Sequence, residues 1–107
     1  MREPHGPTPQ QPLSDTSLHR LPNKLWLYRK KRDLGQKQVA YLMGLKSVAD
    51  ISRYERSEKY PSLINAISLE LALNTPVSSL FPELTSRLHH AMMLRRERLV
   101  NKSKPLS

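Results

Sequence analysis

The segment from residue 35 to residue 55 constrains the fold of this chain more than any other feature. Apolar residues at helical spacing predict a short helix over 36–43, and Gly44 ends it, because glycine suits the left-handed position that follows a helix. Ser47 is expected to cap another helix over 48–56. Two short helices joined by a glycine turn must bury their apolar faces against further helices.

The flanking sequence supplies those further helices and carries no strand signal. We expect a first helix from Asn23, a fourth after the cap residue Ser62, a short fifth over 76–81 and a sixth over 83–101. Asn74 is expected to end the fourth helix in the left-handed conformation. The apolar positions at helical spacing, which predict the core-facing sides, are Val39, Ala40, Met43, Ile51, Tyr54, Leu63, Ile67, Leu71, Leu80 and Phe81.

Composition divides the 107 residues into three parts. Residues 1–22 hold five of the nine prolines and few large apolar groups, so we expect a disordered Pro-rich N-terminal arm. Residues 23–82 have the composition of a small folded domain. Residues 83–107 predict a basic amphipathic helix followed by a tail.

The charge of the chain favours a polyanionic partner. The net charge of +9 and a pI near 10.3 suit phosphate-rich molecules, because each Lys or Arg beside a phosphate releases a condensed counterion. There is no cysteine, which excludes disulfides and thiolate metal sites. The sequence shows neither an apolar run of about 18 residues nor a secretory signal, and we expect a cytoplasmic protein that does not associate with membranes.

Catalysis and cofactor binding find no support in the residue pattern. The four histidines, His5, His19, His89 and His90, lack partners at metal-ligand spacing and are expected to be solvated. There is no glycine-rich phosphate loop and no carboxylate pair beside a nucleophile. We therefore expect no enzyme activity, no metal, no cofactor and no small-molecule substrate.

Several short motifs resemble the Cro/C1-type (XRE-like) helix-turn-helix domain of bacterial and phage regulators. The resemblance covers roughly residues 23–81. It implies an all-α fold: a five-helix lambda-repressor-like domain, here with an extra C-terminal helix. It also implies a regulator, expected to be a repressor, that binds double-stranded DNA with its third helix in the major groove. The motifs are Leu34-Gly35-Gln36-Lys37-Gln38-Val39-Ala40, Gly44-Leu45, Ile51-Ser52-Arg53-Tyr54-Glu55, Pro61-Ser62 and Leu80-Phe81.

The chemistry of the second and third helices suggests how such a surface would contact DNA. Arg53 can pair with guanine, while Val48 and Ala49 can touch a thymine methyl group. Asp50 either accepts from a cytosine amino group or caps the helix start, with capping favoured. The alternative for the arginines is a solvated helix face. The candidate DNA-binding residues are Gln36, Lys37, Lys46, Ser47, Val48, Ala49, Asp50, Ser52, Arg53 and Arg56.

The resemblance also implies a partly buried ion pair between Arg29 and Glu55. The alternative is that both are solvated surface charges. Two departures from the family pattern affect geometry. The turn before Ile51 is one residue longer than the commonest version, which leaves the register of the recognition helix open by one residue. Ser57 occupies a position where glycine is usual, and a left-handed conformation there is costly for serine.

Apolar residues outside the expected core suggest an interface. Trp26 and Leu27 are expected to be exposed on the first helix, and the sixth helix carries an apolar stripe. We expect either a homodimer to which the sixth helix contributes or packing of that helix within one chain. A competing function is an antitoxin or adaptor whose primary role is binding a protein partner. The candidate interface residues are Trp26, Leu27, Leu84, Leu88, Met92 and Leu99.

Overall fold

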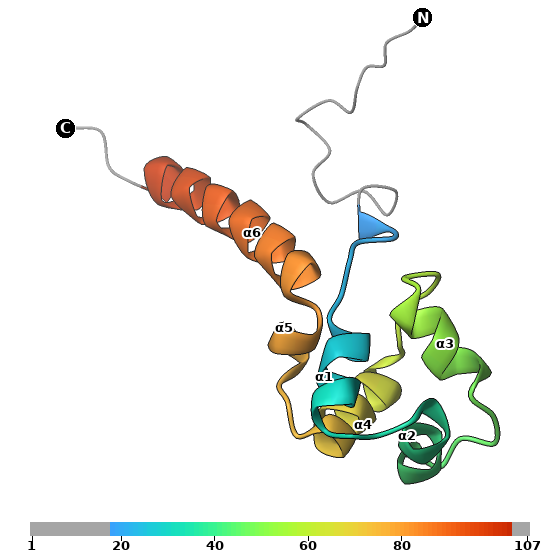
Figure 1. Ribbon diagram of the computed structural model, residues 1–107. Helices are drawn as coiled ribbons and strands as arrows, with labels where there is room; N and C mark the ends of the chain where they lie inside the picture. Colours follow the sequence, from blue (N-terminus) through green and yellow to red (C-terminus); the bar gives the residue numbers. More distant parts are fainter. Residues whose placement is uncertain (1–17, 104–107) are drawn as a thin grey trace, which may run out of the picture.

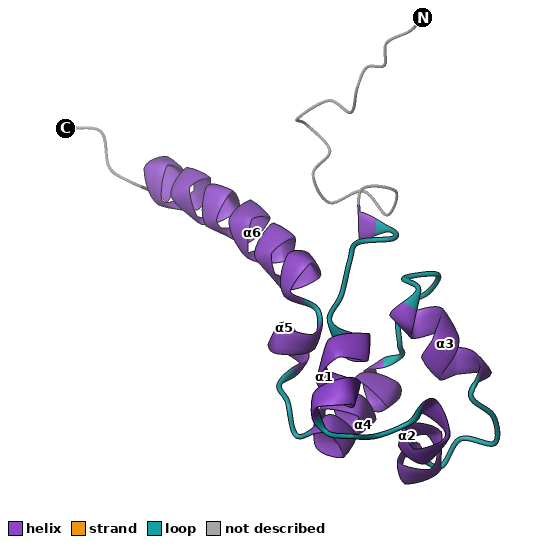
Figure 2. Ribbon diagram, in the orientation of Figure 1, coloured by secondary structure: helices purple, strands orange, loops and turns teal. Residues whose placement is uncertain are grey.

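The computed structural model describes residues 18–103, and within that range it consists of helices joined by turns, with no strand (Figures 1 and 2). The all-α fold with a sixth, C-terminal helix is therefore confirmed. Residues 1–17 of the expected arm, including His5, lie outside the described residues. The helices are α1 (Leu25–Lys31), α2 (Gln36–Met43), α3 (Ala49–Glu55), α4 (Leu63–Leu73), α5 (Val77–Leu80) and α6 (Pro82–Ser103).

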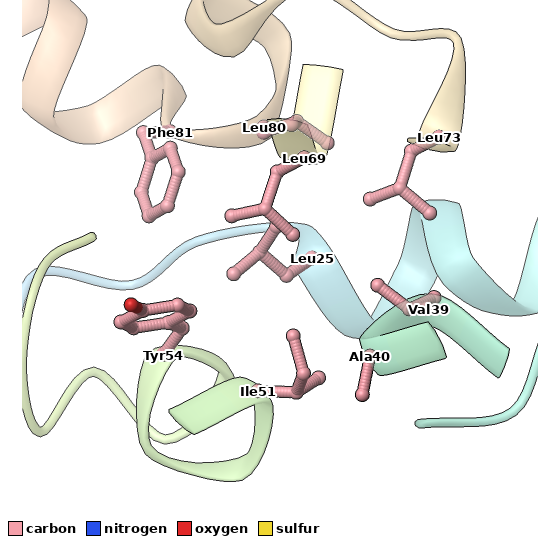
Figure 3. Packing of buried hydrophobic residues seen from close by; sticks show 9 residues of the cluster. All are labelled: Leu25, Val39, Ala40, Ile51, Tyr54, Leu69, Leu73, Leu80 and Phe81. Atoms are coloured by element: carbon pink, nitrogen blue, oxygen red, sulfur yellow. The ribbon is translucent and has the colours of Figure 1, made fainter. Parts of the chain in front are cut away.

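The core lies between α1, α2, α3, α4 and the α5 segment (Figure 3). Leu25 of α1, Val39 of α2 and Ile51 of α3 converge there with side chains from the later helices. Burial of such side chains contributes about 1.5–3 kcal/mol each, which is the main source of stability in a domain of this size. The nine buried residues of the cluster are Leu25, Val39, Ala40, Ile51, Tyr54, Leu69, Leu73, Leu80 and Phe81.

The inner face of α4 differs from the predicted one. Leu63, Ile67 and Leu71 were expected to face the core, and that prediction is wrong, because all three are exposed. Leu69 and Leu73 face the core instead, on the side that packs against α2 and α5. The helix is apolar around most of its circumference, so its periodicity fits two opposite faces equally well.

The predicted turn residues occupy the expected positions. Gly44 has φ of 76° and Asn74 has φ of 48°, both left-handed, and the Ser62 hydroxyl accepts from the Asn65 amide at 3.2 Å. The starts of α1, α3, α5 and α6 differ by one or two residues from the prediction, whereas those of α2 and α4 agree with it. The Asn23 side chain accepts from the Leu25 amide at 2.9 Å, so α1 begins at Leu25 rather than at Asn23. Pro76 precedes α5 without a side-chain cap.

Residues 18–22, which were assigned to the N-terminal arm, lie against the folded domain. Leu21 is buried, and its carbonyl accepts from the Ser57 hydroxyl at 2.7 Å. Ser57 has φ of 59° at the position where the family has glycine. Its hydroxyl also accepts from Asn23 Nδ2 at 3.2 Å. These hydrogen bonds offset the cost of the left-handed serine.

Arg32 fastens the end of α4 to α1. Its Nε donates to the Leu73 carbonyl at 2.7 Å, and its Nη2 donates to the Asn74 carbonyl at 3.0 Å and to the Thr75 hydroxyl at 2.9 Å. The carbonyls at a helix C-terminus have no partner within the helix, and a cation is favoured beside them. This contact fixes α4 against α1.

The long helix α6 leaves the domain after α5. Figure 1 shows it extending away from α2 and α3. Its first turn is held by Leu84, which packs against the core, and it begins at Pro82 rather than at Glu83. Within residues 18–103 no helix is long and apolar enough to cross a membrane.

Candidate nucleic-acid interface

The position of α3 is set by its buried side. Ile51 and Tyr54 enter the core, and Val48 packs against its edge. The Tyr54 hydroxyl accepts from Asn65 Nδ2 of α4 at 2.9 Å, and the Tyr54 carbonyl accepts from Asn23 Nδ2 at 2.8 Å. Because α3 has only two turns, these contacts rather than helix propensity hold it in place.

A buried ion pair joins α1 to the end of α3. Arg29 Nε lies 2.5 Å from Glu55 Oε2, and Arg29 Nη2 donates to Glu55 Oε1 at 3.1 Å. The two side chains are 7% and 8% exposed. Arg29 Nη1 also donates to the Leu34 carbonyl at 3.0 Å, and Gln36 Nε2 donates to Glu55 Oε1 at 3.1 Å. This network fixes the ends of α1 and α3 and the start of α2 relative to one another.

The opposite side of α3 is exposed and its first residues are small. Ser47 and Ala49 are exposed, and the Ser47 hydroxyl accepts from the Ala49 amide at 3.2 Å, so it lies at the start of the helix. Arg53 lies one turn later with an exposed guanidinium, and Ser52 beside it is half-buried. A helix start without bulky side chains allows the backbone to approach base edges closely.

Asp50 pairs with cations instead of capping the helix. Its Oδ1 lies 2.8 Å from Lys59 Nζ and 3.7 Å from Arg53 Nη1. The hydrogen bond at the start of α3 comes from Ser47, which differs from the capping role favoured for Asp50. The carboxylate therefore restrains one cation on α3 and one in the turn that follows it.

Arg56 is also held by neighbours. Its Nε and Nη2 donate to the Glu58 carboxylate at 2.8 and 3.1 Å, and its Nη1 donates to the Ser52 hydroxyl. The hydrogen bond from Arg56 holds the pKa of the Glu58 carboxyl below its usual value, and the same contact raises the pKa of Arg56. Both groups therefore stay charged at neutral pH.

A hollow between α2 and the turn before α3 completes the surface. It has a volume of about 270 Å³, and Lys37 and Lys46 are among the residues that line it. Tyr41, one helical turn after Lys37, lines it with 82% of its surface exposed. Cations and a hydroxyl beside a concave surface are the groups that hold DNA phosphates. The side chain of Gln36, in contrast, donates a hydrogen bond to Glu55.

Two residues of this surface were missed by the sequence interpretation. Tyr41 was not among the predicted DNA-binding residues, although its spacing of four from Lys37 places both on one side of α2. Lys59 was also not among them, and it lies in the turn that follows α3. Its contact with Asp50 depends on how the turn after α3 folds back.

The predicted interface residues lie away from this surface. Trp26 is exposed on α1, with Lys30 Nζ 5.7 Å from its ring centroid, whereas Leu27 is half-buried. Leu84 packs against the core, which accounts for its apolar character without a partner. Leu88, Met92 and Leu99 are exposed along α6.

The described residues contain no cluster that could hold a metal ion. Residues 18–103 include no group of three His, Cys, Asp or Glu side chains arranged for that purpose. His19, His89 and His90 are exposed.

The fold and this surface define a DNA-binding regulatory domain of the helix-turn-helix class. In such a domain one helix is held by the core on its inner side and presents small and cationic side chains on its outer side. A family model described as Helix-turn-helix matches residues 27–80, half of the chain. The chain belongs to the Cro/C1-type helix-turn-helix family of DNA-binding regulators. No curated protein matches the chain.

Proposed function

We propose that this protein is a sequence-specific transcriptional repressor that binds double-stranded DNA as a homodimer. The observation that carries the proposal is the exposed start of α3, near Lys37 and Lys46, on a helix whose other end is held by the Arg29–Glu55 pair. A repressor needs only to occupy a site that the transcription machinery also needs. Such a protein acts where the genome is, in the cytoplasm of a bacterium or of a phage-infected cell.

Direct reading of bases would fall to residues at the start and on the outer side of α3 and in the turn before it. Arg53 would donate two hydrogen bonds to guanine O6 and N7, the commonest specific contact in the major groove. Ala49 and the edge of Val48 would contact a thymine methyl group. Ser47 and Ser52 have short side chains whose hydroxyl groups would accept hydrogen bonds from base edges or donate hydrogen bonds to them.

Phosphate contacts would come from the rim. Lys37 and Lys46 border the hollow, and Arg56 extends from the end of α3. Their role is to position the domain, because phosphates carry no direct sequence information. Tyr41 and Lys59 join this set on the grounds of their exposure. Gln36 would support the surface through its contact with Glu55.

A dimer follows from the geometry of operators for this kind of helix. Two recognition helices related by a two-fold axis fit half-sites about one DNA turn, or ~34 Å, apart. We propose that α6 contributes to the contact between the two chains through Leu88, Met92 and Leu99, which it leaves exposed.

The first experiment is selection of binding sites from a random double-stranded DNA pool, followed by affinity measurements over a salt series. We expect a palindromic consensus and a steep loss of affinity with salt. Lys46→Ala should reduce the slope of log affinity against log salt by about 0.9. Lys102→Ala, which removes the same charge from the end of α6, is the matched control and should leave the slope unchanged. Equal retention of all fragments would refute sequence-specific binding.

An antitoxin or adaptor role is the second candidate. It is favoured by α6, which leaves apolar side chains exposed along a helix that extends away from the domain. In that case the selection would return no consensus, and deletion of residues 88–107 would abolish binding to a protein partner while leaving the domain folded.

A further inference from the structure

The outward side of α4 carries four large aliphatic side chains in contact with solvent. Leu63, Ile64 and Leu71 are each 75% exposed, and Ile67 is 49% exposed. We call these four residues the α4 stripe. The opposite side of the helix contributes Leu69 and Leu73 to the core, and both side chains point inward (Figure 3). Contiguous exposed apolar surface of this kind marks an interaction site.

The α4 stripe is uncharged in a strongly cationic protein. The helix contains no Lys or Arg, and its one carboxylate, Glu70, accepts from the Val77 amide at 3.0 Å. Two copies of a chain with a net charge of +9 repel each other over most of their surface. That repulsion is weakest where no cation projects, and such a surface has no attraction for phosphates either. The electrostatics therefore favour a second copy over DNA at this place.

The spacing of the stripe is self-complementary. Leu63 and Leu71 lie four residues before and four residues after Ile67. If two α4 helices cross in antiparallel fashion at Ile67, each Leu63 meets Leu71 of the second copy, and the two Ile67 side chains meet on the axis. This is an isologous contact, the kind that closes a two-fold dimer. It uses the i±4 ridges on which helices commonly pack.

The distal part of α6 is less suited to pairing with itself. Arg95, Arg96, Arg98 and Lys102 lie close together there, with Glu97 as the one carboxylate among them. Bringing two such segments together would place like charges opposite each other, which is unfavourable.

We propose that the α4 stripe is the main contact surface between two copies of this chain, which pair about a two-fold axis at Ile67. The inference rests on the proposed dimeric function and specifies the surface that forms the dimer. In this arrangement α6 contributes only at the margin. The α3 surface is not part of this contact, since α3 packs against α1 and α2, while α4 packs against α2 and α5 with the side opposite to the stripe.

The absence of cysteine from the sequence allows a direct geometric test. Ile67→Cys introduces one thiol per chain at the proposed axis, and Met92→Cys introduces one on α6 at similar exposure, 52% against 49%. A disulfide requires the two Cα atoms to approach within about 7 Å. In a glutathione redox buffer at low protein concentration, we expect Ile67→Cys to form covalent dimers. We expect Met92→Cys to pair through α4 without a covalent cross-link, because α6 lies only at the margin of this arrangement. Circular dichroism would verify that both variants are folded.

Three results have a clear meaning. Cross-linking of Ile67→Cys, with or without Met92→Cys, supports the proposal. Cross-linking of Met92→Cys alone overturns it and assigns the interface to α6. If neither variant forms a covalent dimer, the proposal is also overturned, and the α4 stripe would then be a surface for a different protein.

A charge-exchange series tests the antiparallel register by sedimentation velocity on the full chain. Leu63→Glu and Leu71→Lys should each abolish the dimer, because each buries an unpaired charge. The double variant should restore it, since the carboxylate introduced at position 63 would then meet the ammonium group introduced at position 71 of the second copy. Loss of the dimer in all three variants would overturn the register.

DNA selection with the same preparations separates this inference from the proposed function. A wild-type chain that is monomeric and still selects a DNA consensus would overturn the α4 interface and leave sequence-specific binding intact. A chain that pairs through α4 but retains all DNA fragments equally would support the interface and refute the function.

Discussion

The two sides of α3 carry ion pairs that differ in burial. On the inner side, Arg29 and Glu55 are 7% and 8% exposed and contact each other through two nitrogen–oxygen pairs. On the outer side, the pairs of Asp50 with Lys59 and of Arg56 with Glu58 involve side chains that are between a third and just over a half exposed. Ion pairs thus fix the helix on its inner side. On its outer side they hold Lys59 and Arg56, whose carboxylate partners can be replaced.

The difference follows from the cost of desolvation. Removing one partner of a buried pair leaves a charge without water, whereas an exposed charge that loses its partner is rehydrated. A phosphate can therefore displace Asp50 or Glu58 at little cost, while nothing from solution can replace Glu55. The comparison predicts that substitutions in the inner pair lower stability strongly, and that substitutions in the outer pairs change DNA binding.

The largest effect is expected for Arg29→Ala. Glu55 would remain buried without its cation, so the free energy of unfolding should fall by about 3–5 kcal/mol, measured by urea denaturation. Replacing both residues, by Arg29→Met with Glu55→Leu, should recover much of that loss because no uncompensated charge remains. A loss for Arg29→Ala as small as that for Arg53→Ala would contradict the distinction between the two sides.

A smaller effect, on binding alone, is expected for Arg53→Ala. Specific DNA binding should weaken by about 1–3 kcal/mol and the preference at one base position should relax, since a bidentate contact is lost. Unfolding should be nearly unchanged. Arg95→Ala on α6 is the matched control and should affect neither. An unaltered base preference would assign Arg53 to a solvated helix face.

The helix order and the turn chemistry were predictable from sequence because they depend on near neighbours. Gly44 and Asn74 end helices in the left-handed conformation and Ser62 caps α4, all through contacts within a few residues. Helix starts were predicted less closely, as for α1, because Asn23 supports the first turn from outside the helix.

Features that depend on the tertiary arrangement were not predictable from sequence. The inner side of α4 was misassigned because Leu63, Ile67 and Leu71 have the same periodicity as a core stripe, and the true inner side is set by α2 and α5. In the candidate site, the exposed start of α3 followed from residue types. The pairing of Asp50 with Lys59 did not, because the turn after α3 brings together residues nine positions apart.

Asp50→Asn tests whether the outer pairs restrain cations or read bases. Without the carboxylate, Lys59 and Arg53 become available to phosphates, so affinity should rise and the salt slope should steepen by about 0.9 for each new phosphate contact. The free energy of unfolding should change by less than about 1 kcal/mol. If Asp50 instead accepts from a cytosine amino group, the variant would lose preference at one base position without any gain in affinity.

The smallest effect is expected for Glu58→Gln, which releases Arg56 for a phosphate and should steepen the salt dependence of DNA binding slightly. The pH dependence of the stability of this variant, compared with that of the wild type, gives a sharper test. Because Arg56 lowers the pKa of Glu58, the pair stabilises the folded state above the unfolded pKa of a glutamate, and that contribution is lost as the pH falls through the lowered pKa. The urea midpoints of wild type and variant should therefore differ at neutral pH and converge in acid. A difference that persists in acid would show that Glu58 acts through packing rather than through its charge, and the contrast with the buried Arg29–Glu55 pair would then fail at this position.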